Sequence, residues 1–368
     1  MRDLKDALLG GRIDRRQFHR LLAAAGLGVA TLPLAGRSGR AADDEILYFS
    51  WEGYDAPELH PAFAAAHGEA MKSATFASEE EALLKVRSGF QATLAHPSTY
   101  TVGRWLEAGV LQPIDTSRLK NYPDLWPGLA NAKGAVEGGK TWLVPFDWGN
   151  SSIVYRTDLV PEADAQSWKL LFDERYAGKL SMYSDPEPCV VVAALAQGFD
   201  NPFSLTDAQL AALKPVLAQQ KGLMRFYWDS QTSMEQSMAS GEIVAAYGWN
   251  SSYAALKAAG HPVAYAHPKE GILTWVAGLV LLNPTFGNLD LAYEFIDAML
   301  DPEVGKYLIE VWGYGHSNRK AFDIADPAAI AAIGIEHPDK LFSEGVFYEP
   351  VNQETAARYV QTFAEATL

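Results

Sequence analysis

The chain of 368 residues contains a single cysteine, Cys189, so an intrachain disulfide is excluded. Three valines follow it, and we expect a buried, unreactive thiol. The eight histidines are scattered: none has the spacing of a metal-binding helix, and no Cys-x-x-Cys pair accompanies them. We therefore expect no metal and no other cofactor.

Motifs of catalysis are missing as well. The sequence has no Gly-x-Ser-x-Gly nucleophile elbow, no Gly-x4-Gly-Lys-Ser/Thr phosphate loop and no Gly-x-Gly-x-x-Gly after a predicted strand. Without a nucleophile or metal motif, a hydrolase is the weaker interpretation, and we predict that the chain is not an enzyme.

Long apolar runs are absent too. Residues 21–36 carry no charge, but sixteen residues rich in glycine and alanine fall short of the ~20 that a membrane span needs. Arginines 12, 15, 16 and 20 precede this run, and Ala41 and Ala42 follow it. This order predicts a signal peptide over residues 1–41. Asp14-Arg15-Arg16-Gln17-Phe18 resembles the twin-arginine motif of Tat substrates, which implies export to the periplasm by that pathway.

Positive charge is scarce. The chain has 30 Lys and Arg against 45 Asp and Glu, a net charge of −15. Residues 1–41 hold eight of the basic and three of the acidic residues, which leaves 22 basic and 42 acidic residues and a net charge of −20. Such a chain repels nucleic acid and anionic membranes, so neither is an expected partner.

The remaining 327 or so residues exceed one typical domain and predict two lobes. Strand and helix patterns alternate, which predicts α/β layers with ligand-facing loops at the carboxyl ends of strands. The predicted strands are 45–49, 142–146, 153–155, 243–248 and 275–282, and the predicted helices are 57–67, 79–90, 102–108, 205–219, 233–240, 291–300 and 302–311. We expect the chain to cross between lobes at 142–155 and to return along 275–282.

Aromatic residues gather in loops and at strand ends, beside small polar residues. They are Trp51, Tyr54, Tyr100, Trp148, Trp228, Trp249, Tyr253, Trp275 and Tyr314. Rings so placed either cap a lobe core or enclose a ligand, and their faces attract an ammonium group. Taken as a set, they predict a ligand cleft.

Seven short segments, in order, resemble the polyamine-type (spermidine/putrescine) periplasmic binding proteins of ABC transporters. The segments are residues 48–54 (YFSWEGY), 97–100 (PSTY), 109–115 (GVLQPID), 168–180 with WKLLF and YAGKL, 248–250 (GWN), 268–275 (PKEGILTW) and 313–314 (GY). Together they extend over nearly all of the chain beyond the signal peptide.

The resemblance implies an α/β fold of the two-lobed, periplasmic binding protein-like type II class, with hinge crossovers between the lobes. Residues 43–146 plus 276–333 would form the N-terminal lobe, and residues 147–275 plus 334–368 the C-terminal lobe. The implied ligand contacts are Trp51, Tyr54, Ser98, Tyr100, Trp249, Trp275 and Tyr314. A monomer would close on a small amine-type solute and deliver it to a membrane ABC transporter permease.

One departure concerns the acids that hold polyamines in such proteins. They would fall at Ala277 and, in the loop after residues 180–183, at Pro186 and Cys189. An ammonium in a closed cleft needs a carboxylate or dense hydrogen bonding in place of its water. We expect Asp185 and Glu187 to supply it. Further candidates, otherwise solvated surface acids, are Glu52, Asp147, Asp229 and Glu349.

Three alternatives stay open on sequence grounds. An opine- or phosphonate-like anionic solute would call for arginine in the cleft, and no arginine falls at a matched position. Ferric ion would call for paired tyrosines, and no Tyr-Tyr pair occurs. A periplasmic hydrolase is the third alternative.

Overall fold

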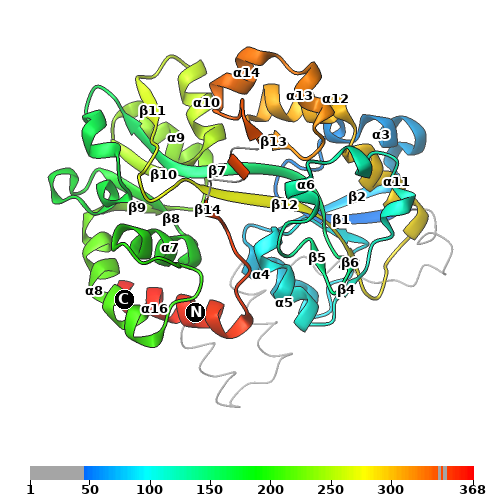
Figure 1. Cartoon of the computed structure of the whole chain (residues 1–368), viewed down its shortest axis with the longest axis horizontal. Helices are drawn as coiled ribbons and strands as arrows, with labels where there is room; N and C mark the ends of the chain where they lie inside the picture. The colour runs from blue at the N-terminus through cyan, green and yellow to red at the C-terminus, as the bar shows by residue number, and fades with distance from the viewer. Residues whose placement is uncertain (1–44, 339–340, 343–345) are drawn as a thin grey trace, which may run out of the picture. The chain divides into compact units, whose positions relative to one another are not determined.

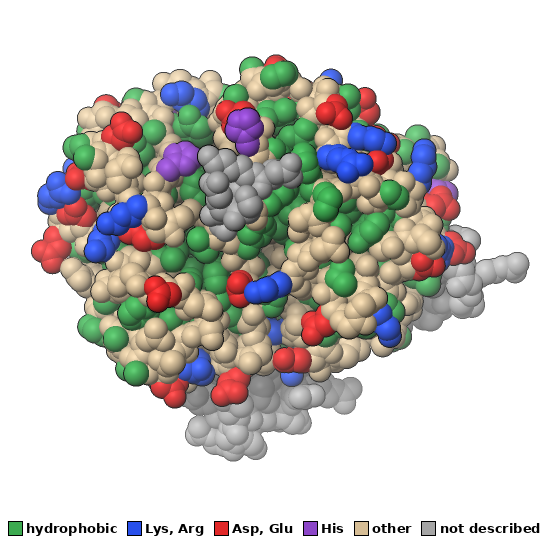
Figure 2. Space-filling model, in the orientation of Figure 1, with side chains coloured by type: hydrophobic (Ala, Val, Ile, Leu, Met, Phe, Trp, Pro, Cys, Tyr) green, Lys and Arg blue, Asp and Glu red, His purple; other side chains and the backbone are tan. Residues whose placement is uncertain are grey.

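The structure, a computed structural model, describes residues 45–338, 341–342 and 346–368. The predicted signal peptide, with its twin-arginine motif, lies outside the described residues. On the face seen in Figure 2, acidic and basic side chains are interspersed among apolar ones. The acidity of the chain is thus not gathered into one patch on this face, and charge alone does not mark a site there.

The strands of the described residues form one large sheet and a short hairpin. Along the sheet the order is β2-β1-β3-β12-β7-β10-β8-β9 (Figure 1). Pairing is parallel from β1 to β2 and β3 and from β8 to β9 and β10, whereas β7 and β12 pair antiparallel in the middle. The strands are β1 Ile46–Ser50, β2 Met71–Thr75, β3 Leu94–Ala95, β4 Leu111–Gln112, β5 Val136–Glu137, β6 Lys140–Thr141, β7 Val144–Arg156, β8 Leu180–Tyr183, β9 Met224–Trp228, β10 Ala245–Trp249, β11 Val263–Tyr265, β12 Leu273–Leu282, β13 Gly315–His316 and β14 Val346–Phe347.

Helices cover both parallel groups of strands. On the side of β8 and β9, α7, α8 and α16 pack against one another (Figure 1). The α-helices are α3 Pro61–His67, α4 Glu79–Arg87, α5 Val102–Glu107, α6 Pro127–Ala130, α7 Pro186–Ala196, α8 Asp207–Leu223, α9 Gln231–Ser240, α10 Asn250–Ala258, α11 Leu289–Met299, α12 Pro302–Tyr307, α13 Lys320–Ile324, α14 Pro327–Ala332 and α16 Gln353–Thr367.

The two long central strands contribute to two separate hydrophobic cores. We call them the first core, which includes Val144 and Phe146 of β7, and the second core, which includes residues 153–155 of the same strand. Strand β12 runs the other way, from Leu273 in the second core to Leu279 in the first. Both strands therefore pass from one half of the structure to the other, as the crossover predictions at 142–155 and 275–282 require. The predicted lobe boundaries themselves stay a prediction.

Helix α7 was not predicted, because its segment was interpreted as a loop. Two prolines and a run of valines disfavour a helix interior. The structure places Pro186 at the first helical position, where a missing N–H costs nothing, and Asp185 caps the helix by accepting a hydrogen bond from the backbone N–H of Glu187. Cys189 is fully buried in this helix, as predicted, and burial raises the pKa of its thiol.

Other predicted elements keep their type but change their limits. The predicted helix 57–67 is broken at His60, because the residue before Pro61 avoids helical backbone angles. The two strand segments predicted at 142–146 and 153–155 are one strand of 13 residues, β7. Ser78 and Asp301 cap α4 and α12, because their side chains accept hydrogen bonds from the backbone N–H groups of Glu81 and Glu303.

Candidate ligand-binding site

Two tryptophans lie between the cores. Trp249, at the end of β10, and Trp275, on β12, are half-buried, and each packs against both the first and the second core. The Trp275 ring also meets Tyr314 nearly at right angles, with centroids 5.0 Å apart. We call the region around these two indoles the junction. Rings that touch both halves are suitably placed to contact a molecule held between them.

The position of Trp275 depends on a glycine on the neighbouring strand. Trp275 pairs with Gly149 of β7, and a Cβ atom at residue 149 would collide with the Trp275 indole and with the Asn250 amide. The Trp275 Nε1–H lacks a hydrogen-bond partner among the described residues. Since a buried N–H costs free energy without an acceptor, this donor is available to a ligand.

Not every aromatic residue in the predicted set belongs to the junction. Trp148 and Trp228 are 0% and 2% exposed, and their indole N–H groups donate to the backbone carbonyls of His316 and Tyr247. These two rings are core residues, so the ligand interpretation was wrong for them. Trp228 still matters to the site, because Trp249 packs edge-on against it at 4.9 Å.

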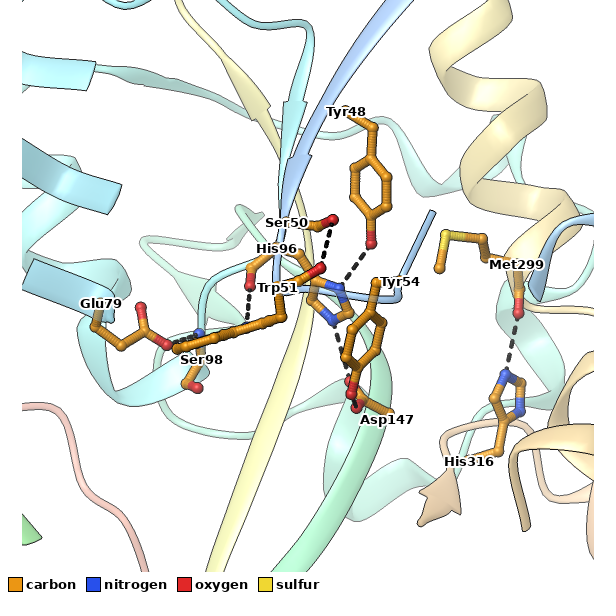
Figure 3. Close-up of polar contacts among 10 residues, drawn as sticks. All are labelled: Tyr48, Ser50, Trp51, Tyr54, Glu79, His96, Ser98, Asp147, Met299 and His316. Carbon is orange, nitrogen blue, oxygen red and sulfur yellow. Dashed lines mark hydrogen bonds and ion pairs between the residues drawn. The ribbon is translucent and has the colours of Figure 1, made fainter. Parts of the chain in front are cut away.

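The loop after β3 brings two predicted contacts to the same region. The backbone N–H of Ser98 donates to Glu79 Oε1 (2.8 Å), and the Thr101 hydroxyl donates to Glu79 Oε2 (3.0 Å). Figure 3 shows the contact between Glu79 and Ser98. Glu79 of α4 thereby fixes the short helical turn that carries Tyr100. The Tyr100 ring packs against Tyr348, at 5.1 Å, and against the second core. The Tyr100 ring, carried by the loop after β3 in the first half, therefore contacts the second half.

The remaining predicted contacts follow β1. The Trp51 indole N–H donates to the His96 carbonyl oxygen (2.9 Å), and the ring packs edge-on against Phe76. The Tyr54 hydroxyl donates to Asp147 Oδ2 at 2.5 Å (Figure 3). Trp51 is half-buried and Tyr54 is 7% exposed.

Asp147 is the centre of a buried polar cluster that the sequence did not reveal. Its Oδ1 lies 3.0 Å from His96 Nε2, and the Tyr48 hydroxyl lies 2.7 Å from His96 Nδ1 (Figure 3). Asp147, His96 and Tyr48 are all fully buried, so the alternative of a solvated surface acid is wrong for Asp147. Burial first, and the Asp147 charge next, raise the pKa of Tyr48 and of Tyr54.

The two acids expected to hold an ammonium group, Asp185 and Glu187, lie at the start of α7. Asp185 is half-buried and is engaged in its cap, whereas Glu187 is 7% exposed and its Oε1 has no hydrogen-bond partner among the described residues. Burial, and then the charge of Asp185, raise the pKa of Glu187 to about 8, against the opposing effect of Arg104. Burial likewise raises the pKa of Glu79 to about 7.

These carboxyl groups lie close enough to act on one another and on Tyr100 electrostatically. The charges of Glu79, Glu187 and Asp185 all act on the Tyr100 hydroxyl, after burial, to raise its pKa. Arg104 opposes them but is itself ion-paired with Glu80. A region with three desolvated acids and one shared cation favours either protons or an added cation.

The other acids considered from sequence do not join this group. Glu52 and Asp229 are exposed, and Glu349 forms a 3.0 Å ion pair with Lys133. Ala277 is buried, and its register neighbours are Asp147 on β7 and, through an isolated bridge, Ser98. Within the described residues, no group of three His, Cys, Asp or Glu side chains could hold a metal ion.

Comparison with known proteins agrees with this architecture. Residues 58–334 match the family of bacterial extracellular solute-binding proteins. The spermidine/putrescine-binding periplasmic protein of Salmonella typhimurium is 26% identical over 344 residues, which cover 93% of this chain and 96% of that protein. The putrescine/agmatine-binding protein of Pseudomonas aeruginosa is 28% identical over 317 residues, 79% of this chain and 83% of that protein.

Among solved structures, the spermidine/putrescine ABC transporter substrate-binding protein of Streptococcus pneumoniae superposes with a TM-score of 0.72 at 21% identity, over 88% of this chain and 98% of that chain. This likeness establishes the predicted fold class, the two-lobed α/β fold of periplasmic binding proteins. Within the described residues, we also find no helix with the length and apolar character of a membrane span. The chain belongs to the bacterial extracellular solute-binding proteins, a transport family rather than an enzyme family.

Proposed function

We propose that this chain is the periplasmic binding protein of an ABC importer and that it captures a small amine-bearing solute, a polyamine or a related compound, between its lobes. The observation that carries the proposal is the state of Glu187: its carboxyl group is buried, one of its oxygens has no hydrogen-bond partner among the described residues, and its charge helps to raise the pKa of the Tyr100 hydroxyl. An ammonium group would supply both the missing donor and the missing charge.

The aromatic residues support the same ligand class. Trp249 and Trp275 would contact the carbon chain of the solute, and their ring faces attract cations by about 0.5–2 kcal/mol for each contact. Closure of the N-terminal lobe (43–146 plus 276–333) on the C-terminal lobe (147–275 plus 334–368) would bury the solute and present the closed face to the permease. The name of the Salmonella relative supports the periplasmic location, and that of the Streptococcus protein, an ABC transporter substrate-binding protein, supports the partner.

An anionic solute finds less support. Arg104, the buried arginine near the junction, is paired with Glu80 and stands among Glu79, Asp185 and Glu187. An anion would be repelled by these acids where they are ionised, and their protonated forms offer it no positive charge. We therefore place opine- or phosphonate-like solutes second.

A thermal-shift titration of the purified protein tests the proposal. Putrescine and spermidine should raise the melting temperature, because a ligand at 100 times its Kd stabilises the folded state by about 2.7 kcal/mol. Stabilisation by opines, phosphonates or ferric ion alone would contradict the proposal, and hydrolysis of an added ester or amide would point to an enzyme.

Export is a separate part of the proposal. We infer that residues 1–41 direct the chain to the periplasm through the Tat pathway. Replacing both Arg15 and Arg16 by lysine should leave the precursor in the cytoplasm, as detected by cell fractionation. Periplasmic protein at unchanged levels would assign export to another route.

A further inference from the structure

The carboxyl group of Asp147 is buried without a lysine or arginine partner among the described residues. Its partners are the His96 ring and the Tyr54 hydroxyl, at 3.0 and 2.5 Å. A buried carboxylate that is hydrogen-bonded but lacks a cation gains free energy when a positive group approaches.

The hydrogen bonds of the cluster leave one acceptor free. The Tyr54 hydroxyl donates to Asp147 Oδ2, and the other carboxyl oxygen, Oδ1, lies 3.0 Å from His96 Nε2. The Tyr48 hydroxyl lies 2.7 Å from His96 Nδ1. A hydroxyl oxygen that donates its hydrogen in one hydrogen bond keeps lone pairs that can accept another. The Tyr54 oxygen can therefore accept a hydrogen bond from a further donor.

The strand register places Asp147 beside the predicted ligand contacts. Asp147 of β7 lies directly opposite Ala277 of β12, and Gly149 lies opposite Trp275. Directly opposed side chains share one face of a sheet, and residues two apart on a strand do as well. Asp147 and Trp275 therefore lie on one face. The Asp147 charge also contributes, after burial, to the raised pKa of Tyr314.

We propose that Asp147 is a positioning residue of the binding site and supplies its second negative charge. The Tyr54 hydroxyl accepts a hydrogen bond from a cationic end of the solute, and the Asp147 carboxylate behind it fixes that hydroxyl and stabilises the positive charge. Glu187 and Asp185, the electrostatic neighbours of Tyr100, hold the other end. The solute is therefore positively charged at both ends, which rests on the proposed function and narrows its ligand class.

Calorimetric titration with two probes tests this assignment. Putrescine has an ammonium at each end, and 4-amino-1-butanol replaces one of them by a hydroxyl. In the unchanged protein, putrescine should bind at least about tenfold more tightly. Asp147→Asn keeps the shape but removes the charge, so it should weaken putrescine binding about tenfold or more and change 4-amino-1-butanol binding by less than about threefold. The matched control is Asp200→Asn, an exposed acid beyond the carboxyl end of α7.

The outcomes separate a binding role from a structural one. If Asp147 has only a structural role, the Asp147→Asn protein should melt at a lower temperature and bind both amines more weakly to the same extent, and this result would overturn the assignment. An Asp147→Asn protein that still binds putrescine tenfold more tightly than 4-amino-1-butanol would overturn it as well. If that variant does not fold, Tyr54→Phe removes the hydroxyl and leaves the carboxylate; undiminished preference for putrescine there also overturns it. If the unchanged protein binds neither amine, the proposed function itself fails.

A double-mutant cycle tests the route through Tyr54. Because Asp147 acts on the solute through the Tyr54 hydroxyl, Tyr54→Phe and Asp147→Asn together should weaken putrescine binding no more than the more damaging single change. Losses that multiply in the double variant would show that the two residues act separately and would overturn this route.

Discussion

Replacing Glu187 by glutamine should make the protein more stable at neutral pH while weakening ligand binding. Glu187 is 7% exposed, and within the described part of the chain one of its oxygens has no hydrogen-bond partner. Its ionised form is therefore disfavoured in the folded protein, whereas the unfolded chain ionises it freely. Glutamine has nearly the same shape and never ionises, so it removes this penalty together with the charge that would hold an ammonium.

The size of the effect follows from the pKa. Burial and the Asp185 charge raise the pKa of Glu187 from 4.5 to about 8. Between pH 4.5 and pH 7 the folded protein keeps a proton that the unfolded chain loses, so stability falls as pH rises and the loss levels off above pH 8. At about 1.4 kcal/mol per pH unit, the cost by pH 7 is roughly 3 kcal/mol. At pH 7 the free energy of unfolding of the Glu187→Gln protein should exceed that of the unchanged protein by this amount.

Urea denaturation at pH 5 and pH 8 measures the increment, since the advantage of Glu187→Gln should be small at pH 5 and large at pH 8. Glu354→Gln is the matched control, because Glu354 occupies the corresponding position in the first turn of α16 but is exposed. An advantage of Glu187→Gln that is the same at both pH values would refute the reasoning, since it would not come from ionisation.

Binding should show the opposite trend. An ammonium stabilises the ionised form of Glu187, so putrescine binding releases a proton, and affinity should rise about tenfold from pH 6 to pH 7. Calorimetry in buffers of different ionisation enthalpy counts the released proton. The Glu187→Gln protein should bind more weakly and with a flatter pH dependence. Amine binding without proton release would contradict the assignment of Glu187.

Other substitutions probe the aromatic residues and the strand register. Trp249→Ala and Trp275→Ala should each abolish stabilisation by putrescine in a thermal-shift assay and leave the unliganded fold largely intact; collapse of the unliganded protein would instead assign the rings to the core. Ala277→Asp should lower the melting temperature, because the new carboxylate would directly oppose Asp147; addition of Asp147→Asn should restore it, and failure to do so would show that the two side chains do not meet. Ser78→Ala removes the N-cap of α4 and should cost about 1 kcal/mol in chemical denaturation, whereas no change would mean that water replaces the cap.

Local sequence patterns predicted whether most of the elements are helices or strands, and they indicated where the aromatic residues of the junction lie in the chain. The pattern that predicts strand 275–282 depends on neighbouring residues only, and the structure contains this strand within β12. Helix α7 was missed because its prolines are favourable only at a helix start, and its valines lie in the second core, where tertiary contacts outweigh propensity.

The polar groups of the site were harder to predict, because they meet only in the folded chain. His96 and Asp147 are 51 residues apart, and neither belongs to a recognisable motif. Glu79 seemed to be one of several acids in the first turn of a helix, yet it is 3% exposed and anchors the Ser98 loop. Burial of this kind depends on which elements the sheet brings together, and no local window of sequence contains that information.

The absent side chain at Gly149 determines how deep the indole of Trp275 lies. Because the ring occupies the volume that a methyl group would fill, alanine there would push the ring away from β7. A change of a few atoms would thus shorten the proposed binding site without altering any proposed contact residue. Position 149 is consequently a place where selection or engineering could adjust the length of the solute that the protein accepts.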